Sequence, residues 1–202
     1  QDLTSVNKLI SNLTTTKVPA TDLILIHAVG DIVRRLAACG ESVLVFLPGS
    51  REILEVDGFL LEHSPDLVTY SMHSSFAEED VRAAFVEVPR NEKRVILASS
   101  IAESSLTIPG VVWIVDCCIS RINTESDLNG MQVFDNVWSS NATLVQRRGR
   151  TGRVCNGNCL HMLPQIILDL VQGYQYCPPT VEATAKAILY TMSSSGCVDT
   201  YL

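Results

Sequence analysis

The chain has 202 residues, of which 47% are apolar, and a formal net charge of −7 at pH 7. This length fits one large domain, or one domain with an appendage, and the apolar fraction is ample for a core. No apolar run approaches the roughly 20 residues needed to cross a bilayer, so we expect no membrane partner. The acidic balance argues against a general polyanion binder, and any nucleic-acid contact should therefore be local and geometric.

The seven cysteines indicate reduced thiols. Their spacings contain no Cys-x-x-Cys and no nearby His pair at zinc-finger spacing, so no metal site is predicted. Cys117 and Cys118 follow an apolar strand and are interpreted as core residues. We expect an intracellular protein, cytoplasmic or nuclear. The chain begins without Met, and we expect it to be a piece of a longer protein.

Three segments are distinguished in chain order. Residues 1–20 are polar and without a sustained period, which indicates a lead-in or linker. Over residues 21–176, helical and strand patterns alternate with Gly/Pro turns between them, which predicts a parallel α/β sandwich. Residues 177–202 are expected to hold a C-terminal helix that ends the domain or begins the next module. Helices are predicted over 21–38 and 51–63, and buried strands over 42–47, 67–71, 94–99, 111–116 and 157–163.

Two loops follow strands and carry small polar residues. The first is Pro48-Gly49-Ser50; in open α/β sheets ligands bind at such strand ends, although an ordinary strand-to-helix turn is the alternative. The second runs from Ser99 to Thr107, and its hydroxyls can donate to phosphate and ribose oxygens without bulk. Farther along, Asn129-Gly130 lies in the middle of an alternating polar segment and predicts a β-hairpin.

The segment 144–154 concentrates four arginines around two glycines. If it forms a helix, Gln146, Arg150 and Arg153 fall at i, i+4 and i+7 and share one face, with Arg147 at its edge. Guanidinium groups present a planar donor fork suited to phosphate, so this face predicts a polyphosphate held in a fixed pose. A solvated basic helix face is the alternative.

These motifs resemble those of a known family. The sequence Gln146-Arg-x-Gly-Arg-x-Gly-Arg153 is similar to motif VI of superfamily 2 helicases. The segment from Ile101 to Gly110 is similar to motif V of the DEAH/RHA group of RNA helicases. Leu44 to Ile53 resembles motif IV of the same group. The resemblance covers about residues 20–195 and implies the second RecA-like domain, a parallel sheet sandwiched by helices, with a β-hairpin between motifs V and VI.

The resemblance also implies a role for each matching position. Gln146, Arg150 and Arg153 would be catalytic, with the two arginines acting as fingers on the γ-phosphate of ATP. This chain departs from the family at Ser100, where the family usually has Asn, and at Asn141, where it often has Lys. The nucleotide would be contacted by Phe85, stacked on adenine, and by Ser105, Thr107 and Arg147; RNA would be contacted by Gly49, Ser50, Arg51, His73, Ser99 and Ser100.

Two motifs that such chemistry needs are absent from the sequence: a Gly-x-x-x-x-Gly-Lys-Ser/Thr phosphate loop and an Asp-Glu-x-His. The ligands for Mg²⁺ would therefore lie on a first RecA-like domain, and this chain alone should not hydrolyse ATP. The expected partners are that domain and single-stranded RNA. A non-catalytic helicase-like scaffold and a DNA helicase are the alternatives.

Overall fold

The computed structural model describes residues 21, 23–86, 93–103, 108–125, 132–152, 156–163 and 168. The helical elements are α2 (Leu23–Ala38), α3 (Ser50–His63), α4 (Glu78–Ala83), the 3₁₀ turn η1 (Ser100–Glu103) and α5 (Asn141–Arg148). The strands are β1 (Ser42–Phe46), β2 (Val68–Met72), β3 (Arg94–Ala98), β4 (Val111–Asp116), β5 (Ile119–Glu125), β6 (Gln132–Trp138) and β7 (Asn158–His161).

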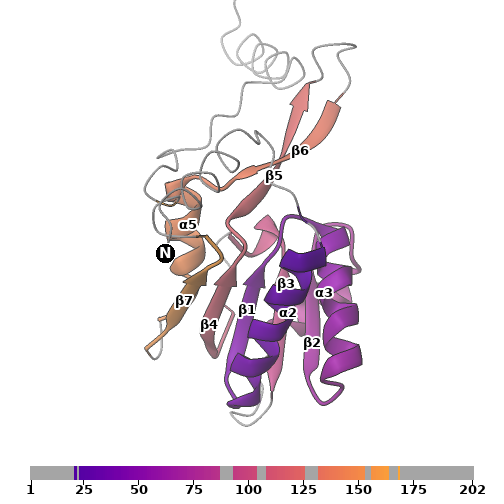
Figure 1. Cartoon of the computed structure of the whole chain (residues 1–202), viewed down its shortest axis with the longest axis vertical. Coiled ribbons are helices and arrows are strands. Elements are labelled where there is room, and N and C mark those ends of the chain that lie inside the picture. Colours follow the sequence, from indigo (N-terminus) through magenta and orange to yellow (C-terminus); the bar gives the residue numbers. More distant parts are fainter. Residues whose placement is uncertain are drawn as a thin grey trace, which may run out of the picture. The chain divides into compact units, whose positions relative to one another are not determined.

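Five strands form the central sheet, in the order β2-β3-β1-β4-β7 (Figure 1). All four pairings are parallel, so every strand ends at the same edge of the sheet. Parallel neighbours require crossover connections, which here run through the helices between the strands. The predicted parallel α/β sandwich is confirmed.

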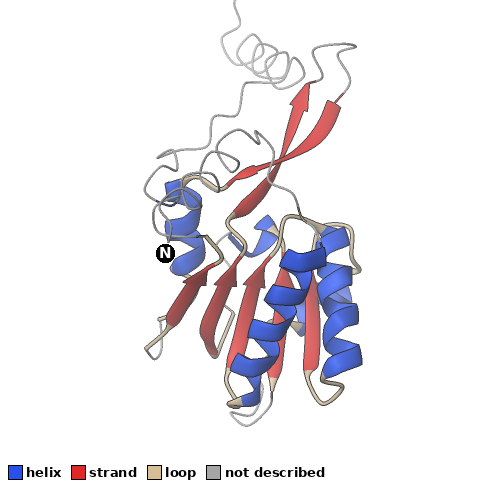
Figure 2. Cartoon of the chain, in the orientation of Figure 1, coloured by secondary structure: helices blue, strands red, loops and turns tan. Residues whose placement is uncertain are grey.

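Side chains on the two faces of the sheet build two separate cores. In β1, Val43 and Val45 pack with α2 and α3, whereas Leu44 and Phe46 pack with residues of β2, η1 and the end of α4. Successive strand residues point to opposite faces, and a strand covered on both faces is apolar throughout. The helices α2 and α3 cover one face in Figure 2. Within the described ranges, every helix is too short or too polar to span a lipid bilayer.

The segment between β4 and α5 forms the predicted hairpin. Strands β5 and β6 pair as a separate two-stranded sheet, while Asn129-Gly130 lies outside the described residues. Among the described residues, the outer part of the hairpin, Ile122–Asp135, belongs to a second compact unit. The domain limits predicted near residues 20 and 176, and the C-terminal helix, fall outside the described residues and stay predictions.

Candidate functional site

Three adjacent strand ends carry the predicted RNA contacts. Gly49, Ser50 and Arg51 follow β1, His73 follows β2, and Ser99 and Ser100 follow β3. Strands β2, β3 and β1 are neighbours in the sheet, so their ends are contiguous at its carboxyl edge. Backbone hydrogen bonds continue beyond the strands, from Ser99 N to the Met72 carbonyl (3.1 Å) and from Leu47 N to the Ala98 carbonyl (2.8 Å). The structure therefore gathers these six residues at one edge.

The six residues differ in what they present to solvent. The side chains of Arg51 and Ser100 are exposed, and Arg51 pairs with Glu55 on the same helix (2.9 Å). Ser50 is half-buried, whereas Ser99 is buried. The accessible donors at this edge are therefore Arg51 and Ser100, and a surface ion pair such as Arg51–Glu55 contributes little and is easily exchanged for a ligand.

Gly49 lies against a partly buried ion pair that the sequence did not indicate. A Cβ atom at Gly49 would come within 2.2 Å of Arg121 Nη1. Arg121 donates to Glu52 Oε1 (2.8 Å) and to Asn136 Oδ1 (3.0 Å), and Glu52 is 1% exposed. The hydroxyl of Thr21 also donates to Glu52 Oε1 (2.9 Å). The turn after β1 is thereby fixed, and glycine is needed there for close approach.

His73 is held as a neutral ring. Its Nδ1 accepts from the backbone N–H of Ser75 (3.0 Å) and lies 2.7 Å from the Ser75 hydroxyl. Burial, followed by the charge of Arg121, lowers the pKa of His73. The ring also contacts Phe76, at 5.6 Å between centroids. At neutral pH this residue therefore offers a hydrogen bond and not a charge.

The arginine-rich segment is a helix only in its first part. Helix α5 begins after Ser140, whose hydroxyl accepts from Thr143 N (3.2 Å), and ends at Arg148 with Gly149 as C-cap. The prediction that one helix carries both Gln146 and Arg150 is therefore wrong, while Arg153 lies outside the described residues. Glycines 149 and 152 explain the end, because glycine is poor in helix interiors and favours the turns that follow them; Gly152 has φ +76°.

Arg147 is not at a nucleotide-facing edge, and that prediction is wrong. The residue is 1% exposed, and its guanidinium donates to Glu103 Oε1 from Nε (2.8 Å) and to Asp116 Oδ1 from Nη1 (2.8 Å). Nη2 also donates to the Ser120 hydroxyl (3.2 Å), and the group lies 5.1 Å from the centre of the Phe46 ring. Arg147 thus joins the segment resembling motif VI to Glu103 of the segment resembling motif V.

The other predicted nucleotide residues are placed as follows. Gln146 is exposed on α5, and Arg150 is half-buried in the turn after it. Thr151 fixes that turn to β4, since its hydroxyl donates to the carbonyls of Val111 (2.8 Å) and Val112 (3.1 Å). Phe85 is half-buried against the core on the α4 side of the sheet, so its stacking on adenine stays a prediction. Arg153, Ser105 and Thr107 lie outside the described residues.

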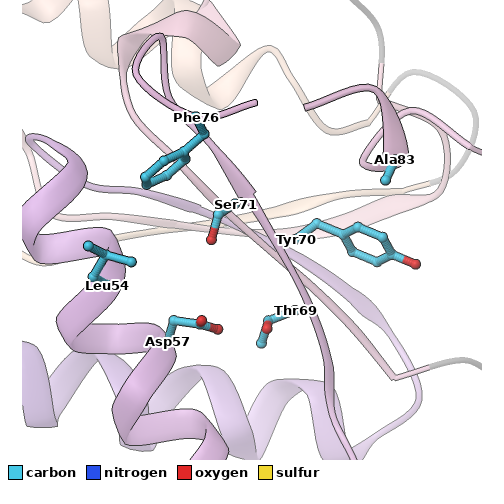
Figure 3. A pocket seen from close by; sticks show the side chains of 7 residues that line it. All are labelled: Leu54, Asp57, Thr69, Tyr70, Ser71, Phe76 and Ala83. Carbon is cyan, nitrogen blue, oxygen red and sulfur yellow. The ribbon is translucent and has the colours of Figure 1, made fainter. Parts of the chain in front are cut away.

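A pocket of about 440 Å³ lies along β2 (Figure 3). None of the predicted site residues lines it. It is bounded by α3, β2 and the segment leading into α4, and its lining residues are Leu54, Asp57, Thr69, Tyr70, Ser71, Phe76 and Ala83. The predicted nucleotide and RNA contacts therefore belong to the open edge of the sheet and not to this pocket.

A solved helicase shares this fold. The chain aligns with the crystal structure of the Escherichia coli DEAH/RHA helicase HrpB at a TM-score of 0.73 and 29% identity, over 90% of this chain and 23% of that one. The parallel sheet, the helices on both faces and the turns at its carboxyl edge are thus those of a RecA-like helicase domain.

Sequence comparison gives the family directly. Residues 25–155 match the helicase conserved C-terminal domain, and the chain belongs to that family. Over 160 residues it is 36% identical to the DExH-box ATP-dependent RNA helicase DExH1 of Arabidopsis thaliana, covering 76% of this chain and 16% of that protein. It is 33% identical over 153 residues to the human ATP-dependent RNA helicase DHX30, covering 73% and 13%. The resemblance to DEAH/RHA helicases is confirmed, and the chain spans less than a quarter of each of these relatives.

Proposed function

We propose that this chain is the C-terminal RecA-like half of an ATP-dependent RNA helicase. It supplies arginine fingers to ATP bound on a first RecA-like domain and forms one side of a track for single-stranded RNA. DExH1 and DHX30 support this proposal, since each is an ATP-dependent RNA helicase. An intracellular location, cytoplasmic or nuclear, is part of the same proposal.

The observation that carries the proposal is the anchoring of the turn that holds Arg150. Three residues earlier, Arg147 is fixed by Glu103 and Asp116, and one residue later Thr151 is bonded to two carbonyls of β4. The backbone that carries the Arg150 guanidinium is therefore fixed at both sides. Preorganised donors stabilise the charge that develops on a transferred phosphoryl group without reorganising during the reaction.

ATP and Mg²⁺ would be held mainly by the first domain, where the phosphate loop and the metal-binding carboxylates are expected. The residues of this chain would act on the γ-phosphate in the transition state, through Arg150 and Arg153, and would position the attacking water through Gln146. Interactions that strengthen only in the transition state raise turnover and not ground-state affinity.

RNA would lie along the ends of β1, β2 and β3. Ser100, the Gly49–Ser50 turn and the neutral His73 offer hydroxyl, backbone and ring donors, which bind phosphates and riboses without reading sequence. Arg51 is the exposed cation there. Because these donors are few and the whole chain carries a charge of −7, the domain alone should bind RNA weakly, with a shallow salt dependence.

The test is the RNA-stimulated ATPase of the full-length protein. Arg150→Ala should lower turnover by at least about a hundredfold, since arginine fingers contribute about 10³–10⁵, while RNA affinity without nucleotide stays near that of the wild type. Arg148→Ala is the matched control, because Arg148 is exposed at the end of α5, two residues away.

Three outcomes would redirect the proposal. Equal losses in Arg148→Ala and Arg150→Ala would remove the special role of the turn. A full-length wild-type protein without ATPase activity would favour the non-catalytic scaffold. Equal stimulation by single-stranded DNA and RNA would favour the DNA helicase, because the 2′-hydroxyl would then go unread.

A further inference from the structure

Three side chains with metal-binding atoms meet where β4 and β7 end. Asp116 and His161 are paired in register at the ends of these adjacent strands, and Cys118 follows two residues after Asp116. His161 Nδ1 lies 3.6 Å from Cys118 Sγ and 3.6 Å from Asp116 Oδ2. The three ligand atoms all lie within 4.8 Å of one another, and Asp116 and Cys118 are buried.

One oxygen of the Asp116 carboxylate faces His161 without a hydrogen bond of ordinary length. Oδ1 accepts hydrogen bonds from Arg147 Nη1 and from the backbone N–H of Cys118, both at 2.8 Å. Oδ2 is buried, and no described residue donates a hydrogen bond to it; its neighbour His161 Nδ1 is beyond ordinary hydrogen-bond length. Buried carboxylate oxygens are normally hydrogen-bonded, and the 3.6 Å between Oδ2 and His161 Nδ1 leaves room for an ion that both atoms would bind.

The backbone of Cys118 is the third observation. Its φ is +59°, and among the described residues it is the only non-glycine residue with a positive φ. Residues with a Cβ atom rarely adopt this left-handed conformation, and such outliers are concentrated at functional sites. Here the conformation brings both the backbone N–H and the sulfur of Cys118 back towards Asp116, with Sγ also 3.3 Å from the Asp116 carbonyl.

We propose that Asp116 Oδ2, Cys118 Sγ and His161 Nδ1 bind one zinc ion. A tetrahedral zinc ion at about 2.0–2.3 Å from its ligands separates neighbouring ligand atoms by roughly 3.3–3.8 Å, and the two 3.6 Å distances fall in that range. A set of one sulfur, one nitrogen and one oxygen suits zinc and not Mg²⁺ or Ca²⁺, which prefer oxygen alone. The fourth position would hold water.

The bound state would carry two negative charges from its ligands, one on the Asp116 carboxylate and one on the Cys118 thiolate. Binding would release the thiol proton of Cys118 into solvent.

Cys159 has a different place in the cluster. Its Sγ lies 3.7 Å from His161 Nε2, the ring nitrogen that the proposed zinc does not use. It therefore orients the imidazole and does not bind the same ion. Such outer partners fix the ring of a metal-binding histidine.

The experiment titrates the metal-free 202-residue chain with Co²⁺, a spectroscopic substitute for zinc, and then displaces it with Zn²⁺. We expect saturation by a single Co²⁺, visible bands of a four-coordinate ion and a near-ultraviolet thiolate-to-cobalt charge-transfer band. The key variant is Cys118→Gly, which removes the sulfur and accepts the positive φ without strain. It should lose the charge-transfer band and bind Zn²⁺ at least about a hundredfold more weakly, since even outer partners contribute 10–100-fold.

The control is Cys39→Ser, which removes an exposed thiol far along the chain from the cluster and should leave the spectrum unchanged. Circular dichroism of each variant shows whether the fold is kept. A wild-type chain that binds no Co²⁺ at micromolar concentration overturns the proposal. So does a charge-transfer band that survives in Cys118→Gly or disappears in Cys39→Ser, since another cysteine would then be the ligand.

Discussion

At the ends of β1, β2 and β3 polar groups face solvent, whereas at the ends of β4 and β7 they face one another. Arg51 and Ser100 are exposed at the first place, while Arg147 and Asp116 are 1% and 0% exposed at the second. Groups of the first kind are free to contact a ligand. Groups of the second kind hold segments together, as Arg147 does for the segment that also carries Arg150. The phosphate contact proposed for Arg150 would be a different role.

The variant with the largest expected effect is Arg147→Ala. The change leaves Asp116 and Glu103 without their guanidinium, and removing one partner of a buried ion pair costs about 3–5 kcal/mol. We expect the free energy of unfolding, measured by urea denaturation, to fall by that amount. Arg148→Ala, at an exposed neighbouring position, should change it by no more than about 0.5 kcal/mol. Similar values for both variants would mean that the buried network does not stabilise the domain.

Gly49→Ala tests whether the turn after β1, at the solvent-facing strand ends, depends on the buried charge of Glu52. The new methyl group would approach Arg121 Nη1, which Glu52 and Asn136 hold in place. Such overpacking should cost about 1–3 kcal/mol. Gly58→Ala is the matched control, because a Cβ there meets no described atom within 4 Å and alanine favours helices by up to about 1 kcal/mol. A neutral Gly49→Ala variant would show that Arg121 moves aside freely.

The smallest effect is expected from Phe85→Ala. This variant tests whether Phe85 contacts the nucleotide or stabilises the core. If the ring stacks on adenine, the Michaelis constant of the full-length protein for ATP should rise about tenfold, as expected for a contact of 1–2 kcal/mol. Turnover should change little. A loss of unfolding free energy with an unchanged Michaelis constant would instead assign Phe85 to the core beside Met72 and Ala84.

Much of the fold could be predicted because its central strands β1 and β3 are buried on both faces. The run Val43–Leu47 is apolar throughout, and the strand found there is Ser42–Phe46. The resemblance to helicase motifs IV and V identified the loops at the strand ends. The hairpin was predicted from Asn129-Gly130 and its alternating flanks.

Tertiary partners were beyond such reasoning. The periodicity of residues 146–153 assumed a helix that continues past Gly149, and nothing local to Arg147 reveals Glu103 and Asp116 as its partners. The cluster of Asp116, Cys118 and His161 depends on β4 and β7 being neighbours in a set register. The order of strands in a sheet cannot be deduced from the sequence of any single segment. The spacing of the cysteines along the chain therefore predicted no metal site.

Asp116 limits how this part of the chain can change. Its two carboxylate oxygens have separate neighbours, Arg147 and Cys118 on Oδ1 and His161 near Oδ2. Asparagine would keep one acceptor and place donor hydrogens towards the other neighbour, and glutamate would add a methylene where the side chain is fully enclosed. Neither replacement preserves both sides, so tolerated substitutions here should come as compensated pairs, with a change at Asp116 accompanied by one at Arg147 or His161.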